Sequence, residues 1–474
     1  MRLRSLLLPV MAASAALLAG CGSSTNKATG ARAAKPVVLT LATNNSADDD
    51  IGAWTRAVER LSHGSIRIAL RNKWRADETF SERGTLADVR AGRVDAARIA
   101  ARAWDTLGVK SFQALQAPLL VDSLALEERV LTGSLGAEML AGVRTAGVEP
   151  VAVLPGPLRR PLGVSRDVLG PEDYRGGRIG SRPAGVAAAT ARALEAAYVD
   201  VAAGGSLDGL DVFDAGLADI DFSHYDRQAR SVTINAVLWP GAVTLVVNRG
   251  TWRHLAPAQR EVLVRAGDEA IAPTIGILRD YERSAVHALC ERQFRLVQAG
   301  ADGIRDLRRA VEPVHRALEE DAATRLTLAR IRELKAHTPA APAPHCRSQA
   351  PRSTPAPDAG PLVGTWQGHA TRARMAAADR EIGESVEDNY GDVTLDLGPN
   401  GRYEFRNARF PGELAGLGSW SVHGNVISMH EEGTVEQGAG TTWRYRWTLF
   451  HGALVLHKLA GAPTALTVAP LRRG

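Results

Sequence analysis

The residue types that could carry out chemistry occur in this sequence without the spacing that catalysis requires. The closest approach to a hydrolase nucleophile is Gly163-Val164-Ser165, but position 167, where the motif needs a second glycine, is an aspartate. Gly204-Gly205-Ser206 lacks the spacing of a dinucleotide fingerprint. The adjacent His345 and Cys346 could hold a metal, but they stand without further ligands nearby. The sequence therefore predicts no catalytic residue, no metal and no cofactor, and favours a binding protein.

The composition is that of a globular protein. Of the 474 residues, 45% are hydrophobic and 23% are charged, which excludes a disordered chain, a collagen-like fibre and a multi-span membrane protein. The 57 basic residues exceed the 52 acidic ones by five, and the two kinds are interleaved, so no nucleic-acid partner is indicated. Three cysteines are too few for a disulfide scaffold or a four-cysteine zinc site.

The first residues have the order of a secretion signal. Arg2 and Arg4 precede a short apolar run over 6–18, which ends in Leu-Ala-Gly-Cys at Cys21. This tetrad resembles the bacterial lipobox, which implies a lipoprotein signal peptide over 1–20 and a lipid on Cys21; the alternative is an ordinary signal peptide. Residues 21–35 are polar and suit a tether. We therefore expect an extracytoplasmic protein, anchored by its lipid to the membrane, in the periplasm or on the outer face of the cell.

The sequence alone does not decide whether the two remaining cysteines form a disulfide. An oxidising compartment permits a bridge between Cys290, on a predicted helix, and Cys346, in a proline-rich segment. Two unpaired thiols are the other outcome.

A linker divides the chain into two different folds. Residues 337–361 hold 7 of the 24 prolines, which excludes a helix or a central strand there. Beyond it lie 10 of the 24 aromatic residues, in under a quarter of the length. We therefore expect one domain over 36–336 and a second over 362–474.

The first domain alternates strand-like and helix-like patterns. Residues 37–42 read as a strand, apolar residues three and four apart over 51–61 predict a helix, and 66–70 alternates as a half-buried strand does. This is a βαβ unit, which requires a parallel pair of strands. The pattern continues with helices over 82–91 and 124–143 and with strands over 94–100, 151–154, 178–180, 199–201, 237–239 and 243–248. From Pro257 to about Lys335 we expect long helices, bent or broken at Pro273 and Pro313.

The second domain changes to a period of two. Residues 393–397 and 403–405 alternate on either side of a turn at 398–401, and further strands are expected over 420–429, 443–450 and 453–459. Short strands without helices predict a small antiparallel barrel or sandwich. Gly364-Thr365-Trp366 resembles the opening of lipocalin-like barrels, which implies a barrel whose base is closed by tryptophan. Such a barrel could hold an apolar ligand, or be filled and serve as a spacer or partner surface; we take the second as the default.

Several motifs of the first domain follow a familiar order. Gly92-Arg93-Val94-Asp95 precedes a strand, Phe112, Leu115 and Pro118 follow, then come Glu172-Asp173-Tyr174 with Gly176 and Ile179, and finally Trp252 with Leu255. This order resembles the solute-binding proteins of TRAP transporters, the dicarboxylate-receptor type, over about residues 35–335. The resemblance implies an α/β periplasmic-binding-protein-like fold of two lobes joined by a hinge and a long helix.

The resemblance also implies a ligand site. In typical members, arginine forks grip a carboxylate with two parallel hydrogen bonds, a geometry that lysine cannot copy. The upstream arginine of the pattern corresponds to Arg160, with Arg159 beside it, but the principal position is Gly180. Arg182 can fill the same space; otherwise the principal clamp is absent and the ligand is not a simple mono- or dicarboxylate.

Four further residues are candidates for the cleft, each with a structural alternative. Asn44 ends the first strand, where a parallel sheet opens toward ligands, or it caps the next helix. Trp239 precedes the hinge-like Pro240-Gly241 and forms either an apolar wall or part of the core. Ser206 and Tyr225 follow segments that face the cleft in the family.

The sequence thus predicts a receptor that performs no reaction. It captures a small, carboxylate-bearing organic solute between two lobes and delivers it to the membrane permease subunits of an ion-gradient-driven TRAP-type transporter. The alternative is a secreted envelope lipoprotein whose C-terminal barrel is the active ligand-binding or enzymatic module.

Overall fold

The structure is a computed structural model that describes residues 36–44, 51–202, 204–346, 357–379, 390–399, 401–407, 416–431, 442–460 and 466–474. The expected signal peptide, the lipidated Cys21 and the tether lie outside the described residues. We call residues 36–346 the body and residues 357–474 the barrel domain. No helix in the described ranges combines the length and the apolar character that a bilayer crossing demands.

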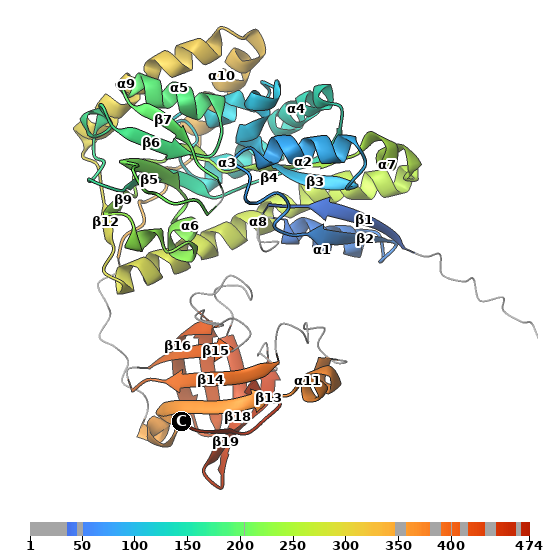
Figure 1. The fold of residues 1–474 in the computed structure, drawn as a ribbon, viewed down its shortest axis with the longest axis vertical. Helices are drawn as coiled ribbons and strands as arrows, with labels where there is room; N and C mark the ends of the chain where they lie inside the picture. The colour runs from blue at the N-terminus through green and yellow to red at the C-terminus, as the bar shows by residue number, and fades with distance from the viewer. Residues whose placement is uncertain are drawn as a thin grey trace, which may run out of the picture. The chain divides into compact units, whose positions relative to one another are not determined.

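The first lobe of the body is built on a mixed sheet (Figure 1). Its strand order is β2-β1-β3-β11-β4, with β1 Val37–Ala42, β2 Ile66–Arg71, β3 Ala96–Ala100, β4 Glu149–Leu154 and β11 Val243–Val247. The predicted βαβ unit is confirmed, because β1 pairs in parallel with β2 and helix α1 (Gly52–Leu61) connects them. The lobe also contains α2 Ser81–Arg90, α3 Leu124–Thr132, α4 Ser134–Gly142 and α7 Arg249–His254. The single helix expected over 124–143 is wrong, since Gly133 is extended and separates α3 from α4.

The second lobe has its own sheet. The strand order is β12-β9-β5-β8-β6-β7, and β10 also pairs with β5. The bounds are β5 Leu158–Gly163, β6 Arg178–Ser181, β7 Ala197–Asp200, β8 Val212–Ala215, β9 Ser231–Thr233, β10 Trp239–Pro240 and β12 Arg295–Val297, with helices α5 Gly185–Ala193, α6 Leu217–Phe222 and α9 Ala301–Glu319. Strand β5 is not predicted by the sequence, because arginines and Pro161 interrupt its apolar pattern.

The chain passes between the sheets at β4 to β5 and at β10 to β11, and helix α8 (Pro257–Glu291) spans both lobes. Near its start, α8 packs Leu263 against Trp54, whose indole N–H donates to the Leu263 carbonyl at 3.1 Å. Near its end, Leu289 packs with the core of the second lobe. Figure 1 shows α8 running from α1 to α6. The predicted two lobes with a hinge and a long helix are therefore confirmed.

Of the two outcomes expected at the prolines, a bend or a break, the break does not occur. Helix α8 continues through Pro273, and α9 continues through Pro313. A proline removes one backbone hydrogen bond and costs about 3 kcal/mol in a helix interior. Here one face of each helix is buried near its proline, at Ile271 and Ile275 in α8 and at Val311 and Val314 in α9, so packing offsets that cost. The body ends with α10 (Ala322–Ala336).

A disulfide attaches the start of the linker to the body. Cys290, in the last turn of α8, is bonded to Cys346, with 5.7 Å between the two Cα atoms. Of the two outcomes left open by the sequence, the structure has the bridge.

The barrel domain is a closed antiparallel barrel in the order β13-β14-β15-β16-β17-β18-β19-β20. Its strands are β13 Gly364–Ala370, β14 Gly391–Leu397, β15 Arg402–Asn407, β16 Gly416–His423, β17 Val426–Glu431, β18 Thr442–Phe450, β19 Ala453–Ala460 and β20 Leu471–Arg473. The single strand expected over 420–429 is wrong, because the chain turns at Gly424 with φ +58°. The expectation of no helix is also wrong, since α11 spans Arg372–Asp379. The predicted all-β barrel itself is confirmed.

Candidate functional site

A cavity of about 260 Å³ lies between the two lobes. The first lobe contributes Asn44 after β1 and Arg98 on β3, and the second lobe contributes Asp214 on β8. The hinge strands and the middle of α8 complete the wall. Because both lobes and the hinge line one space, a molecule bound there would contact every part that moves when such lobes close.

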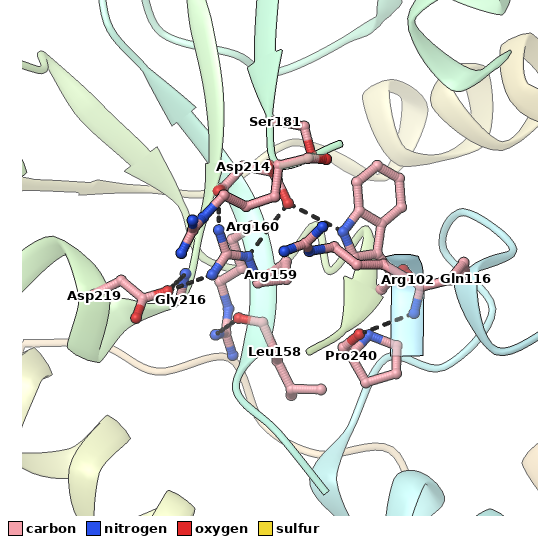
Figure 2. A network of polar contacts seen from close by, with 12 residues as sticks. Arg102, Gln116, Leu158, Arg159, Arg160, Ser181, Asp214, Gly216, Asp219 and Pro240 are labelled. Atoms are coloured by element: carbon pink, nitrogen blue, oxygen red, sulfur yellow. Dashed lines mark hydrogen bonds and ion pairs between the residues drawn. The ribbon is translucent and has the colours of Figure 1, made fainter. Parts of the chain in front are cut away.

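Arg159 on β5 is neutralised by two carboxylates of the second lobe (Figure 2). Its Nε donates to Asp214 Oδ2 at 3.3 Å and its Nη1 to Asp219 Oδ2, while Nη2 donates to the Asp214 carbonyl. Burial by itself would lower the pKa of Arg159, but the charges of Asp214 and then Asp219 hold its pKa above the usual value. The backbone N–H of Gly216 also donates to Asp219 Oδ2, at 3.2 Å. The single guanidinium of Arg159 therefore forms ion pairs with two carboxylates.

Asp214 also fixes the aromatic wall. The indole N–H of Trp239 donates to Asp214 Oδ2 at 3.1 Å, and Trp239 is 5% exposed. The ring of Tyr225 stands edge-on to Phe213 with centroids 5.5 Å apart, and its hydroxyl donates to the Gly205 carbonyl at 3.4 Å. The second lobe thus offers a rigid surface with both apolar and acidic parts.

Arg182 differs from the other arginines of the cavity. It follows β6, and among the described residues no hydrogen bond or ion pair of its guanidinium is formed; only its carbonyl is used, accepting from Ser181 and Tyr198. Burial, and next the charge of Arg102, lowers the pKa of Arg182 to about 10. The charges of Glu82 and Asp219 attract the guanidinium, but neither forms an ion pair with it, so an anion that pairs with it directly would offset part of the cost of its burial.

The neighbouring arginines are already engaged. Arg102 pairs with Glu82 and donates from Nη1 to the Pro183 carbonyl at 2.8 Å. Arg98 donates to Asn44 Oδ1 at 3.3 Å, and Asn44 donates to Ser81 Oγ at 3.4 Å. These contacts hold the first-lobe side of the cavity in place, whereas the guanidinium of Arg182 forms no such contact within the described ranges.

The side chain at position 180 cannot reach the cavity in this chain. A Cβ added to Gly180 would lie 2.4 Å from Leu210 Cδ1 and 3.0 Å from Val201 Cγ2. Both neighbours belong to the apolar core of the second lobe. Apolar packing thus occupies the direction that an arginine would need, and Arg182, two residues later, is the arginine that lines the space.

Of the predicted site residues, Asn44, Arg182, Trp239 and Tyr225 line the cavity together. Arg160 does not: it is 2% exposed, and its guanidinium donates to Glu282 Oε1 at 2.6 Å and to the carbonyls of Ile234 and Leu158 at 3.1 Å. Arg159 and Arg160 are neighbours on a strand, so their side chains leave opposite faces.

Ser206 is likewise outside the cavity wall. It is exposed, and its hydroxyl accepts the backbone N–H of Asp208 at 3.0 Å, as in a local turn. Sequence reasoning missed Arg102, Asp214 and Asp219 as cavity residues. The one available signal was the spacing of Asp219, three residues after Gly216, which is typical of the first turn of a helix.

Comparisons with known proteins agree with this architecture. The family model of bacterial extracellular solute-binding proteins, family 7, matches residues 39–321, more than half of the chain. Among curated protein sequences, none matches this chain significantly.

Three solved structures show the same fold at low identity. A TRAP periplasmic solute-binding protein from Bradyrhizobium sp., in complex with galacturonate, is 18% identical with a TM-score of 0.56, over 62% of this chain and 99% of that one. A sugar acid binding protein from Advenella mimigardefordensis, in complex with galactonate, is 17% identical with a TM-score of 0.56, over 64% and 99%. A TRAP protein from Ralstonia eutropha with bound (S)-2-acetolactate is 20% identical with a TM-score of 0.54, over 64% and 99%.

The matched family and the two-lobed body with its interlobe cavity lead to one conclusion: this chain belongs to the bacterial extracellular solute-binding proteins, family 7.

Proposed function

We propose that the protein is an extracytoplasmic receptor that captures a small carboxylate-bearing solute between its lobes and delivers it, chemically unchanged, to an ion-gradient-driven TRAP-type permease. The observation that carries this proposal is the guanidinium of Arg182, which lines the interlobe cavity without a partner among the described residues. A solute carboxylate supplies the missing charge and accepts two parallel N–H bonds from the fork.

The size of the cavity supports a small solute. Pockets for drug-sized ligands occupy roughly 300–1,000 Å³, so a cavity of about 260 Å³ suits a molecule at or below the lower end of that class. The ligands in the three related structures, galacturonate, galactonate and acetolactate, are small organic carboxylates. We take a sugar acid as the first candidate for this chain.

Closure of the lobes is the proposed signal to the permease. Arg182 comes from the second lobe, and Asn44 and Arg98 come from the first. A solute that contacts both stabilises the closed arrangement more than the open one, because only the closed form makes both sets of contacts. The closed surface is the one that we propose the permease recognises.

We further propose that residues 1–20 are a lipoprotein signal, that a lipid on Cys21 anchors the protein to the membrane, and that 21–35 is a tether. In this proposal the solute-binding domain spans 36–336, the linker 337–361 and a lipocalin-like spacer or partner surface 362–474. Support comes from the positions of α10, which ends at Ala336, and of β13, which begins at Gly364.

The test is titration calorimetry of sugar acids against the wild-type chain and two variants. Arg182→Ala is expected to weaken binding by at least about tenfold, because charged hydrogen bonds contribute about 1.5–3 kcal/mol each. Arg182→Lys is expected to recover only part of the loss, since an ammonium cannot form the fork.

The matched control is Arg175→Ala. Arg175 belongs to the same lobe but is 64% exposed and pairs with Glu195, so its loss should leave affinity unchanged. Unchanged affinity in Arg182→Ala, or the absence of binding by every carboxylate solute tried, would contradict the proposed function.

A further inference from the structure

The carboxylates that line the cavity are distributed unevenly among its arginines. They are Asp214, Asp219, Asp221 and Glu282. Asp221 pairs with Arg292 at 2.6 Å, and Glu282 pairs with Arg160 at 2.6 Å, so each of these two has an arginine that does not line the cavity. Asp214 and Asp219 share the single guanidinium of Arg159.

The cavity therefore has two ends of opposite character. The guanidinium of Arg182 feels the charges of Glu82 and Asp219 but forms no ion pair among the described residues. The directly paired group of Arg159, Asp214 and Asp219, by contrast, carries one negative charge in excess. We propose that the solute is a monocarboxylate whose far end carries hydrogen-bond donors, and that Asp219 selects against a second carboxylate there. This inference rests on the proposed function and names its substrate class.

Arg159 is not available as a second carboxylate clamp. Its Nε, Nη1 and Nη2 all donate to Asp214 or Asp219. A second solute carboxylate placed against Arg159 would be the third anion around one guanidinium. Like charges brought together in a partly desolvated site oppose binding and so discriminate between solutes.

Asp219 is the carboxylate that a solute can reach. Its side chain is 41% exposed, while that of Asp214 is 3% exposed. Asp219 Oδ2 accepts from Arg159 and from the Gly216 N–H, but an ionised carboxylate has about four acceptor positions, so acceptor capacity remains. A hydroxyl or an ammonium donates to such a group, whereas a carboxylate cannot.

Three solutes that differ at one carbon test this selectivity. Galactonate ends in a hydroxymethyl group, 6-amino-6-deoxygalactonate ends in an ammonium, and galactarate ends in a second carboxylate. By calorimetry on the full chain, we expect galactonate or its amino analogue to bind at least about tenfold more tightly than galactarate, a difference of about 1.4 kcal/mol. The order of the first two shows whether the donor is a hydroxyl or an ammonium.

The variant Asp219→Asn identifies the residue responsible. Asparagine keeps the size and an acceptor for the Gly216 N–H but removes the charge, so the preference over galactarate should shrink at least about fivefold while Arg182 still binds the first carboxylate. Asp302→Asn is the matched control, because Asp302 is 82% exposed on α9 and does not line the cavity. It should leave the preference unchanged.

The outcomes separate the two proposals. Galactarate binding as tightly as galactonate, or an unchanged preference in Asp219→Asn, overturns the selectivity while the receptor function stands. If no six-carbon acid binds, 4-hydroxybutanoate against succinate gives the same comparison on a shorter skeleton. Absence of binding by all of these acids overturns the proposed function and the selectivity with it.

Discussion

In the cavity between the lobes, arginines and carboxylates surround an open space, whereas the described part of the barrel domain buries aromatic and aliphatic side chains against one another. Trp366 and Trp443 are at most 1% exposed there, and the indole N–H of Trp366 donates to the Leu362 carbonyl at 2.7 Å. In the cavity, by contrast, the guanidinium of Arg182 forms no hydrogen bond or ion pair among the described residues, although Glu82 and Asp219 attract it. The difference separates two kinds of interior: the barrel domain buries mainly apolar side chains, and the body keeps a charged side chain at an open cavity.

The largest expected effect is on the barrel. Trp366→Ala should lower the stability of the barrel domain by about 3–5 kcal/mol, because it removes a buried aromatic side chain and leaves a void. Hydrogen exchange on the full chain measures this, with faster exchange in β13 to β20. Phe450→Ala is the control, since Phe450 is 66% exposed on β18 and its loss should change little. Equal effects of the two variants would show that the barrel interior is not the packed core described here.

Next in size is the contrast between two arginines of the second lobe. Arg160→Met should destabilise the body by about 3 kcal/mol, because it removes a buried cation and leaves the partly buried Glu282 carboxylate without its partner. Arg182→Gln should keep or raise the melting temperature of the solute-free protein, since burial and Arg102 disfavour the charge it removes. Thermal unfolding of both variants decides this. A stable Arg160→Met beside an unstable Arg182→Gln would reverse the roles assigned to them.

A smaller, pH-dependent effect is expected at Glu127 of α3. Its Oε1 accepts the Gly156 N–H at 2.9 Å near the hinge, and its Oε2 has no hydrogen-bond partner. Burial raises the pKa of Glu127 to about 8, with a further contribution from the charge of Glu282. The folded state thus keeps a proton that the unfolded state has lost, so this group makes the body less stable as pH rises from about 4.3 to about 8.

Glu127→Gln should remove that dependence and stabilise the body by about 2.5 kcal/mol more at pH 7 than at pH 5, since one pKa unit corresponds to about 1.4 kcal/mol. Denaturant unfolding at the two pH values measures it. Glu128→Gln is the matched control, because the adjacent Glu128 is 30% exposed and pairs with Arg279 at the surface. The same pH profile in wild type and Glu127→Gln would show that Glu127 does not titrate in this way.

The sequence predicted the frame of the molecule better than its site. The βαβ unit of β1, α1 and β2 could be predicted because its hydrophobic residues change from strand spacing to helix spacing and back. The barrel could be predicted because its hydrophobic residues alternate with a period of two. Strand β5 was not, because Arg159, Arg160 and Pro161 interrupt its pattern, yet this strand holds an arginine of the cavity. Strand β8, with Asp214, was missed as well.

The sequence by itself determined that the chain has an α/β first domain, a proline-rich linker and an all-β second domain, because each of these depends on neighbouring residues. Only the tertiary structure decided which arginine lines the cavity. Arg159 meets Asp214 and Asp219, which are 55 and 60 positions away, and Arg160 meets Glu282, which is 122 positions away. Local sequence patterns do not predict ion pairs between residues so far apart in the chain. Which arginine remains without an ion pair can therefore be seen only once the tertiary structure has placed the other charged side chains.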